Sequence, residues 1–159
     1  SDLVLYRAGT PSDAIWYGRP ERGRFDPVAV GVTGAYQPIV GDFAGDGADD
    51  VLWYAPGTGA ERLWSGHPGS RIFGRSDPGA VSGRYRPFAA DVDGDGADEV
   101  IWYGPGSTAD RRWDGVGASR VSTALTITGE YQPLPGDTDG DRTDEVVWYG
   151  AGGRPEAAW

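Results

Sequence analysis

The chain has 159 residues and a formal net charge of −10, from 14 basic and 24 acidic side chains. It contains no cysteine, which excludes disulfides and thiolate metal sites, and no apolar run of about 18 residues, which excludes a transmembrane helix. Its basic residues are too scattered to follow a phosphate backbone, so we expect neither a nucleic-acid partner nor membrane insertion.

One pattern recurs along almost the whole chain. It is marked by acids at Asp2, Asp50, Glu99 and Glu145, at intervals of 48, 49 and 46 residues. Each marker is followed by an apolar strand, a turn, a second strand that ends in tryptophan, a variable third segment and a Gly-x-Tyr-x-Pro segment. The apolar strands are expected at residues 3–6, 51–54, 100–103 and 146–149, and the Gly-x-Tyr-x-Pro segments at 34–38, 83–87 and 129–133.

Four short strands in a period of about 48 residues are typical of β-propeller blades. The 27 glycines and 12 prolines would break a helix, so we expect an all-β fold of four-stranded antiparallel blades. The chain is expected to be one repeat domain over 1–159, with two whole blades flanked by two incomplete ones. Such a propeller is incomplete, or is completed by a homo-oligomer or by blades of a longer parent chain. The units are 2–49, 50–98, 99–144 and a partial unit, 145–159.

The seven tryptophans occupy fixed positions in the repeat. Exposed aromatic rings could stack on carbohydrate, but rings at fixed positions within strands are typical of a core between blades. We therefore predict that Trp53, Trp102 and Trp148 are core residues. The set that ends the second strands is also predicted to be core, nearer a blade edge: Trp16, Trp64, Trp113 and Trp159.

Three aspartate-rich loops precede the last three apolar strands and hold 14 of the 24 acids. The first loop is 42–50, the second 91–99 and the third 137–145. Carboxylates at positions 1, 3 and 5 of a tight loop converge on one point, and such clusters of hard oxygen ligands select Ca²⁺. A glycine at position 6 makes the turn, position 7 offers its carbonyl, and an acid at position 8 or 9 closes the shell.

The three loops are unequal. The second has every expected ligand, the first has Ala44 at position 3, and the third has Arg142 where glycine is preferred. We expect affinity for Ca²⁺ to fall from the second loop to the third and then the first, with two or three ions per chain. The alternative is that these are ordinary acidic turns without a metal.

The loops, followed by Tyr54-Ala-Pro-Gly57 or Tyr103-Gly-Pro-Gly106, resemble the FG-GAP repeats of integrin α-subunit propellers. The Trp-Tyr strands and Gly-x-Tyr-x-Pro segments are closer still to bacterial VCBS-type repeats. This resemblance implies four-stranded blades, an extracellular setting and calcium held at positions 1, 3, 5, 7 and 9. The implied ligands are Asp42, Asp46, the Ala48 carbonyl and Asp50; Asp91, Asp93, Asp95, the Ala97 carbonyl and Glu99; and Asp137, Asp139, Asp141, the Thr143 carbonyl and Glu145. Position 8 offers Asp49, Asp98 and Asp144 as alternatives to position 9.

The leading functional hypothesis is a secreted, non-enzymatic, calcium-stabilised module that binds or supports a glycan or protein, in the way that some relatives of such repeats act as lectins or adhesion domains. The alternative is an accessory domain or fragment of a secreted hydrolase. Catalysis within this chain is not expected. The only histidine, His67, lies in a turn, and Glu61, Asp110 and Glu156 share one repeat position, which favours a structural role.

Overall fold

The computed structural model describes residues 2–106, 108–152 and 156–159. Within these ranges the chain is all-β, as predicted, with one short 3-10 turn, η1 (Gly117–Ser119), and no α-helix. None of its described helical residues forms a segment long and apolar enough to span a membrane. Contacts divide the chain into two compact units, Ser1–Tyr36 and Gln37–Trp159, and each unit is described by itself.

The first unit is a three-stranded antiparallel sheet of β1 (Leu3–Leu5), β2 (Asp13–Gly18) and β3 (Phe25–Val30). Its middle strand alternates buried and more exposed residues, and Ile15 and Tyr17 lie on the buried face. This period of two is what a half-buried strand requires.

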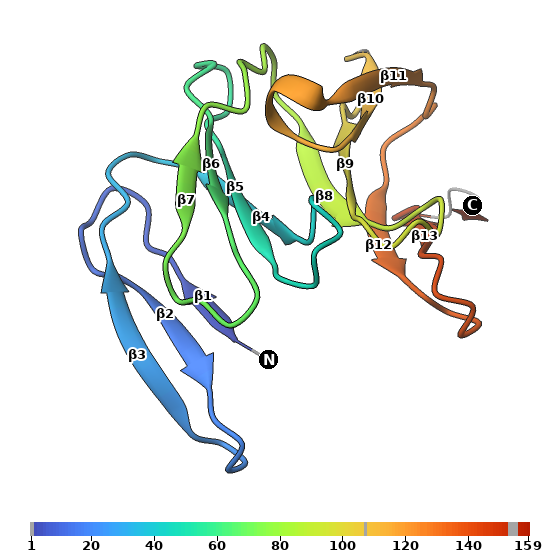
Figure 1. Cartoon of the computed structure of the whole chain (residues 1–159). Coiled ribbons are helices and arrows are strands. Elements are labelled where there is room, and N and C mark those ends of the chain that lie inside the picture. The colour runs from blue at the N-terminus through green and yellow to red at the C-terminus, as the bar shows by residue number, and fades with distance from the viewer. Residues whose placement is uncertain (1, 107, 153–155) are drawn as a thin grey trace. The chain divides into compact units, whose positions relative to one another are not determined.

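The second unit contains three antiparallel sheets in chain order (Figure 1). Within each sheet, strands that are consecutive in sequence pair with each other. Every connection is therefore either a hairpin or a segment that leads to the next sheet. The sheets are β4 (Gln37–Gly41), β5 (Asp50–Tyr54), β6 (Arg62–Ser65) and β7 (Gly74–Ser76); β8 (Arg86–Ala90), β9 (Glu99–Tyr103), β10 (Asp110–Asp114) and β11 (Val121–Leu125); and β12 (Gln132–Gly136), β13 (Glu145–Tyr149) and β14 (Ala157–Ala158).

Each aspartate loop is the connection of a β-hairpin. The strand before the loop pairs with the strand after it, so that Gly41 lies opposite Asp50, Ala90 opposite Glu99, and β12 beside β13. The sheets are therefore offset by one strand from the sequence units that begin at the marker acids. As a result, the position-9 acid is the first residue of a paired strand, and the ladder fixes its backbone.

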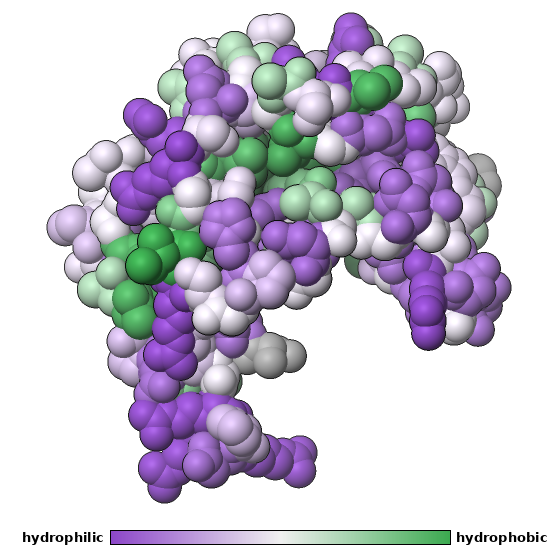
Figure 2. All heavy atoms as spheres, viewed as in Figure 1, coloured by the Kyte–Doolittle hydropathy of each residue, from purple (hydrophilic) through white to green (hydrophobic). Residues whose placement is uncertain are grey.

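The central strands β5 and β9 are buried along their whole length, as their β-branched and aromatic residues predict. Trp53, Trp102 and Trp148 are only 1–2 % exposed, which confirms that they belong to the core. Leu52 and Tyr54 from one sheet pack in one cluster with residues of the next sheet. Hydrophobic residues are visible between the β4–β7 and β8–β11 sheets in the space-filling view (Figure 2).

The four tryptophans predicted to end the second strands differ in burial. Trp64 and Trp113 are buried as predicted, whereas Trp16 and Trp159 are 38 % and 49 % exposed, so the prediction that they are core residues was wrong. The difference lies in what covers the ring. An arginine guanidinium lies 4.7 Å from the ring centre of Trp64 and 4.1 Å from that of Trp113, and the residues that supply them are Arg75 and Arg120.

Three tyrosines, at the end of β5 and β9 and just after β1, bind the backbone of the Gly-x-Tyr segment that follows each of them in the chain. The Tyr54 hydroxyl donates to the carbonyl of Gly83 at 2.9 Å and accepts the N–H of Tyr85 at 3.0 Å. Tyr103 and Tyr6 repeat the arrangement. The glycine is required because its φ is 118° and a Cβ would lie 3.0 Å from the Tyr85 ring. No sheet among the described residues closes on itself, and the arrangement as propeller blades stays a prediction.

Candidate functional site: three acidic hairpin loops

The position-1 aspartate organises each loop by accepting hydrogen bonds from its backbone. In the second loop Asp91 accepts the N–H of Gly94 at 2.8 Å and that of Gly96 at 3.0 Å, one on each carboxylate oxygen. These bonds wrap the chain around the carboxylate, as an Asx turn does. Asp42 and Asp137 accept two backbone N–H groups each in the same way.

The position-5 aspartate holds the exit of the loop. Asp95 accepts the N–H of Ala97 at 2.9 Å, and this bond fixes the peptide that begins position 7. The same bond joins Asp46 to Ala48 and Asp141 to Thr143. The loop backbone is therefore held in shape by the side chains that were predicted as ligands.

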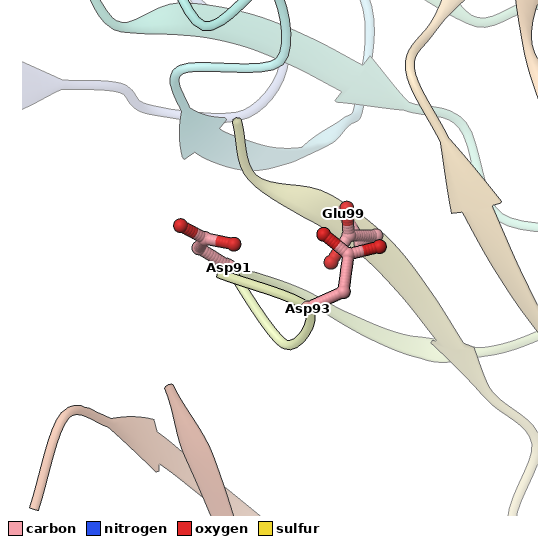
Figure 3. Close-up of side chains that lie close together, drawn as sticks. All are labelled: Asp91, Asp93 and Glu99. Carbon is pink, nitrogen blue, oxygen red and sulfur yellow. The ribbon is translucent and has the colours of Figure 1, made fainter. Parts of the chain in front are cut away.

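Two groups of three carboxylates converge in the second and third loops. One oxygen each of Asp91, Asp93 and Glu99 lies within 4.8 Å of the other two. The three side chains are drawn in the close-up, where the carboxylates of Asp93 and Glu99 lie next to each other (Figure 3). The corresponding group of the third loop is Asp137, Asp139 and Glu145. A Ca²⁺ ion binds oxygens at about 2.3–2.6 Å, so oxygens on opposite sides of one ion are separated by up to about 5 Å. Each group could therefore hold one metal ion of this size that prefers oxygen ligands.

The first loop forms no such group among the described residues. Ala44 removes one carboxylate, and the position-9 acid is the shorter aspartate, Asp50. Asp50 accepts the N–H of Gly66 at 2.8 Å, across the β5–β6 hairpin, just as Asp2 accepts that of Gly18 in the first unit. The longer Glu99 instead accepts the N–H of Val92, within its own loop, at 3.0 Å.

The position-8 aspartates link one loop to the loop before it. Asp98 accepts the N–H of Asp42 at 2.7 Å and donates its own N–H to the Asp42 carbonyl at 2.8 Å. Asp144 makes the same pair of bonds to Asp91, at 3.2 and 2.7 Å. These carboxylates face the neighbouring loop, and they are absent from both three-carboxylate groups. Asp49, the third residue of this kind, is exposed.

Burial makes several of these acids resist ionisation. Burial of the Glu99 carboxyl away from water raises its pKa to about 7, although the hydrogen bond that it accepts from the backbone of Val92 acts in the opposite direction. The pKa values of Asp50 and Asp98 are raised for the same first reason. A bound cation would favour the charged form of Glu99, so metal binding and ionisation of this residue are expected to support each other.

Two arginines lie in or beside the aspartate loops, and sequence reasoning identified only one of them. Arg142 has a φ of 78°, the only positive φ of a non-glycine residue within the described ranges, as position 6 requires. Arg112 lies 3.6 Å from a carboxylate oxygen of Asp93 and 2.7 Å from one of Asp114. It stands on β10, beyond the loop in sequence, so spacing within the loop motif gave no signal of it.

The acids considered for catalysis have structural partners. Asp110 is 4 % exposed and accepts the N–H groups of Gly104 and Ile127, both at 2.8 Å. Asp13 binds two backbone N–H groups in the same way, and Glu61 binds that of Val81. Each of these acids joins the turn or strand beside it to a later segment. This agrees with the structural role expected at that repeat position, although Glu156 differs in being exposed.

Comparison with known proteins found no matching family model, no matching curated protein and no matching solved structure. The fold and the site themselves define the class: an all-β protein of small antiparallel sheets, in which two of the hairpin loops gather carboxylates.

Proposed function

We propose that the chain is a non-enzymatic, extracellular repeat module that binds calcium in its aspartate loops, with sheets that form the blades of a propeller. Its role is to bind or support a glycan or a protein. The observation that carries the proposal is the pair of three-carboxylate groups in the second and third loops. The resemblance to FG-GAP and VCBS-type repeats supports the propeller arrangement and the extracellular setting.

In this proposal positions 1, 3 and 9 of the second and third loops contact the ion directly. Glu99 and Glu145, rather than the position-8 aspartates, close the shell, because Asp98 and Asp144 are committed to the neighbouring loop. The position-5 aspartates and the carbonyls of Ala97 and Thr143 complete it. The first loop binds more weakly, because it lacks a carboxylate at Ala44 and Asp50 is bonded to Gly66.

Calcium in these loops serves the fold. Each ion neutralises a group of acids at one end of a hairpin. Through the hydrogen bonds of Asp98 and Asp144, the loop that holds the ion also fixes the backbone of the preceding loop. Binding to the folded state alone stabilises it by about 2.7 kcal/mol when the free ion exceeds its Kd a hundredfold. The sheets joined in this way are then rigid enough to present a ligand site.

Calorimetric titration of metal-free protein with Ca²⁺ tests the proposal, with Mg²⁺ as the competing ion. We expect two tighter sites, in the second and third loops, and one weaker site. Asp93→Ala, which gives the second loop the residue that the first loop has naturally, should remove one tight site. Glu21→Gln, which removes a carboxylate from an exposed turn of the first unit, should change nothing. Absence of calcium binding at millimolar concentration would contradict the proposal.

A further inference from the structure

A second candidate site lies in the second unit, away from the aspartate loops. It is a pocket of about 290 Å³ between the β8–β11 sheet and the segment that connects β7 to β8, named here the Arg111 pocket. This volume is at the lower end of the range of about 300–1,000 Å³ typical of small-molecule sites, and it suits a single ring. The pocket is lined by Ala80, Val81, Ser82, Tyr85, Trp102, Arg111, Trp113, Arg120 and Ser122.

The charge of the Arg111 pocket is opposite to that of the chain. Two arginines line it and no acid does, although the chain has a net charge of −10. Arg111 is exposed and forms no ion pair within the described ranges. Arg120 is held in place by the ring of Trp113 and by a hydrogen bond from Nη1 to the carbonyl of Pro78. A guanidinium has five N–H donors, so donors of both arginines remain for an anion.

Trp102 contributes a buried donor with no partner. Its side chain is 1 % exposed, it lines the pocket, and its Nε1 has no hydrogen-bond acceptor among the described residues. A buried N–H without an acceptor is costly, and the ring that carries it lines the pocket. Trp102 pairs across the strands with Arg111, so the two donors share one face of the sheet. In the third sheet Trp148 has the same unpaired Nε1 but pairs with Ala157, whereas Trp53 of the β4–β7 sheet pairs with Arg62. A cross-strand arginine is therefore present in two of these three sheets, and the Arg111 pocket is distinguished by a second arginine, Arg120, in its lining.

The remaining lining residues favour a hydroxylated ring. Ser82 and Ser122 are exposed, and Tyr85 is half-buried with its ring 5.7 Å from that of Trp102. Hydroxyl groups and aromatic rings at the edge of a pocket complement the hydroxyls and the apolar face of a sugar. We propose that the Arg111 pocket binds an acidic sugar, with Arg111 and Arg120 holding its carboxylate. This inference rests on the proposed binding role of the module, but it does not depend on the aspartate loops.

The experiment uses the full chain in calcium buffer and follows the indole N–H signals of its tryptophans by NMR. Glucuronic acid and galacturonic acid are titrated beside glucose and galactose, which lack the carboxylate, and beside benzoate, which lacks the hydroxyls. We expect the uronic acids to shift the Trp102 indole signal and to bind at least about tenfold more tightly than the neutral sugars or benzoate. Affinity should fall as salt is added.

Two variants locate the effect. Arg111→Gln should weaken uronic acid binding about tenfold or more, whereas Arg22→Gln, which removes an exposed charge in the first unit, should leave it unchanged. Equal binding of neutral sugars and uronic acids, equal binding of benzoate, an unshifted Trp102 signal, or an Arg111→Gln variant with full affinity would each overturn the inference. None of these results would affect calcium binding, so failure of the acidic-sugar site is distinguishable from failure of the proposed metal sites.

Discussion

Aspartate and glutamate at position 9 of the loops differ by one methylene group and make different hydrogen bonds. Asp50 crosses to the next hairpin and accepts the N–H of Gly66, while Glu99 reaches back to Val92 and joins Asp91 and Asp93. The motif treats aspartate and glutamate as equivalent at this position. The backbone ladder fixes the first residue of the strand, so the longer side chain of Glu99 reaches the acidic group while it keeps a hydrogen bond within its own loop.

The strained backbone of Arg142 gives the first prediction. Its φ of 78° lies in the region that glycine occupies in the other loops, at 85° for Gly47 and 90° for Gly96. Arg142→Gly should raise the free energy of unfolding by about 1 kcal/mol, because it removes that strain. Urea unfolding with and without calcium measures the change.

The reverse substitution provides the control for the Arg142 prediction. A Cβ at Gly96 would meet no atom within 4 Å, so Gly96→Arg adds backbone strain without a steric clash. It should lower the free energy of unfolding by a similar amount. If both variants have the stability of the wild type, position 6 does not require glycine.

The raised pKa of Glu99 gives the second prediction, for the metal-free protein. Its folded pKa of about 7 exceeds the ordinary value of 4.5, so the folded state binds more protons than the unfolded state between these two pH values. By linkage, the free energy of unfolding should fall as the pH rises from about 4.5 to about 7. The raised pKa values of Asp50 and Asp98 act in the same direction.

Urea unfolding in EDTA at several pH values tests this dependence. Glu99→Gln should reduce the slope and should be more stable than the wild type at pH 8, since it removes the buried charge. With saturating calcium the sign should reverse, because the ion depresses the pKa of its ligands and acid then displaces it. A wild-type protein whose metal-free stability rises between pH 5 and pH 7 would contradict the assignment.

At the scale of elements, the sequence predicts strands well and the links between them poorly. Strand positions follow from β-branched and aromatic runs between turns, and β5 (Asp50–Tyr54) begins one residue before its predicted start. The role of position 8 could not be read from spacing. The partner of Asp98 is the backbone of Asp42, 56 residues earlier, and only the packing of successive hairpins brings them together.

The third prediction concerns this link between loops. Asp98→Ala should lower the free energy of unfolding by about 1–3 kcal/mol, because it leaves the N–H of Asp42 without its acceptor. Asp49→Ala is the matched control, since Asp49 occupies the same position of the first loop and is exposed. Its effect should stay within about 0.5 kcal/mol. Equal effects of the two variants would show that the link contributes nothing.

At the scale of the whole molecule, the aspartate loops are distributed unequally between the two units. The aspartate loops all lie in Gln37–Trp159, while the first unit carries only Asp2 at the equivalent of position 9. The sequence alone predicts where this acidity lies, because each loop is a contiguous run of residues. The Arg111 pocket was not predictable in that way, since its lining comes from four separate segments of the chain, which only the fold brings together.

The last prediction follows from this distribution. Excess EGTA should lower the melting temperature by several degrees or more, because calcium bound only to the folded state stabilises it by about 2.7 kcal/mol per site at a hundredfold excess over Kd. Hydrogen exchange should show the loss of protection in residues 37–159, and most strongly in the strands that flank the second and third loops. Residues 1–36, which contain no aspartate loop, should keep their protection. A melting temperature that EGTA leaves unchanged would mean that the carboxylate groups are acidic turns held by their own backbone hydrogen bonds, and that calcium does not stabilise the fold.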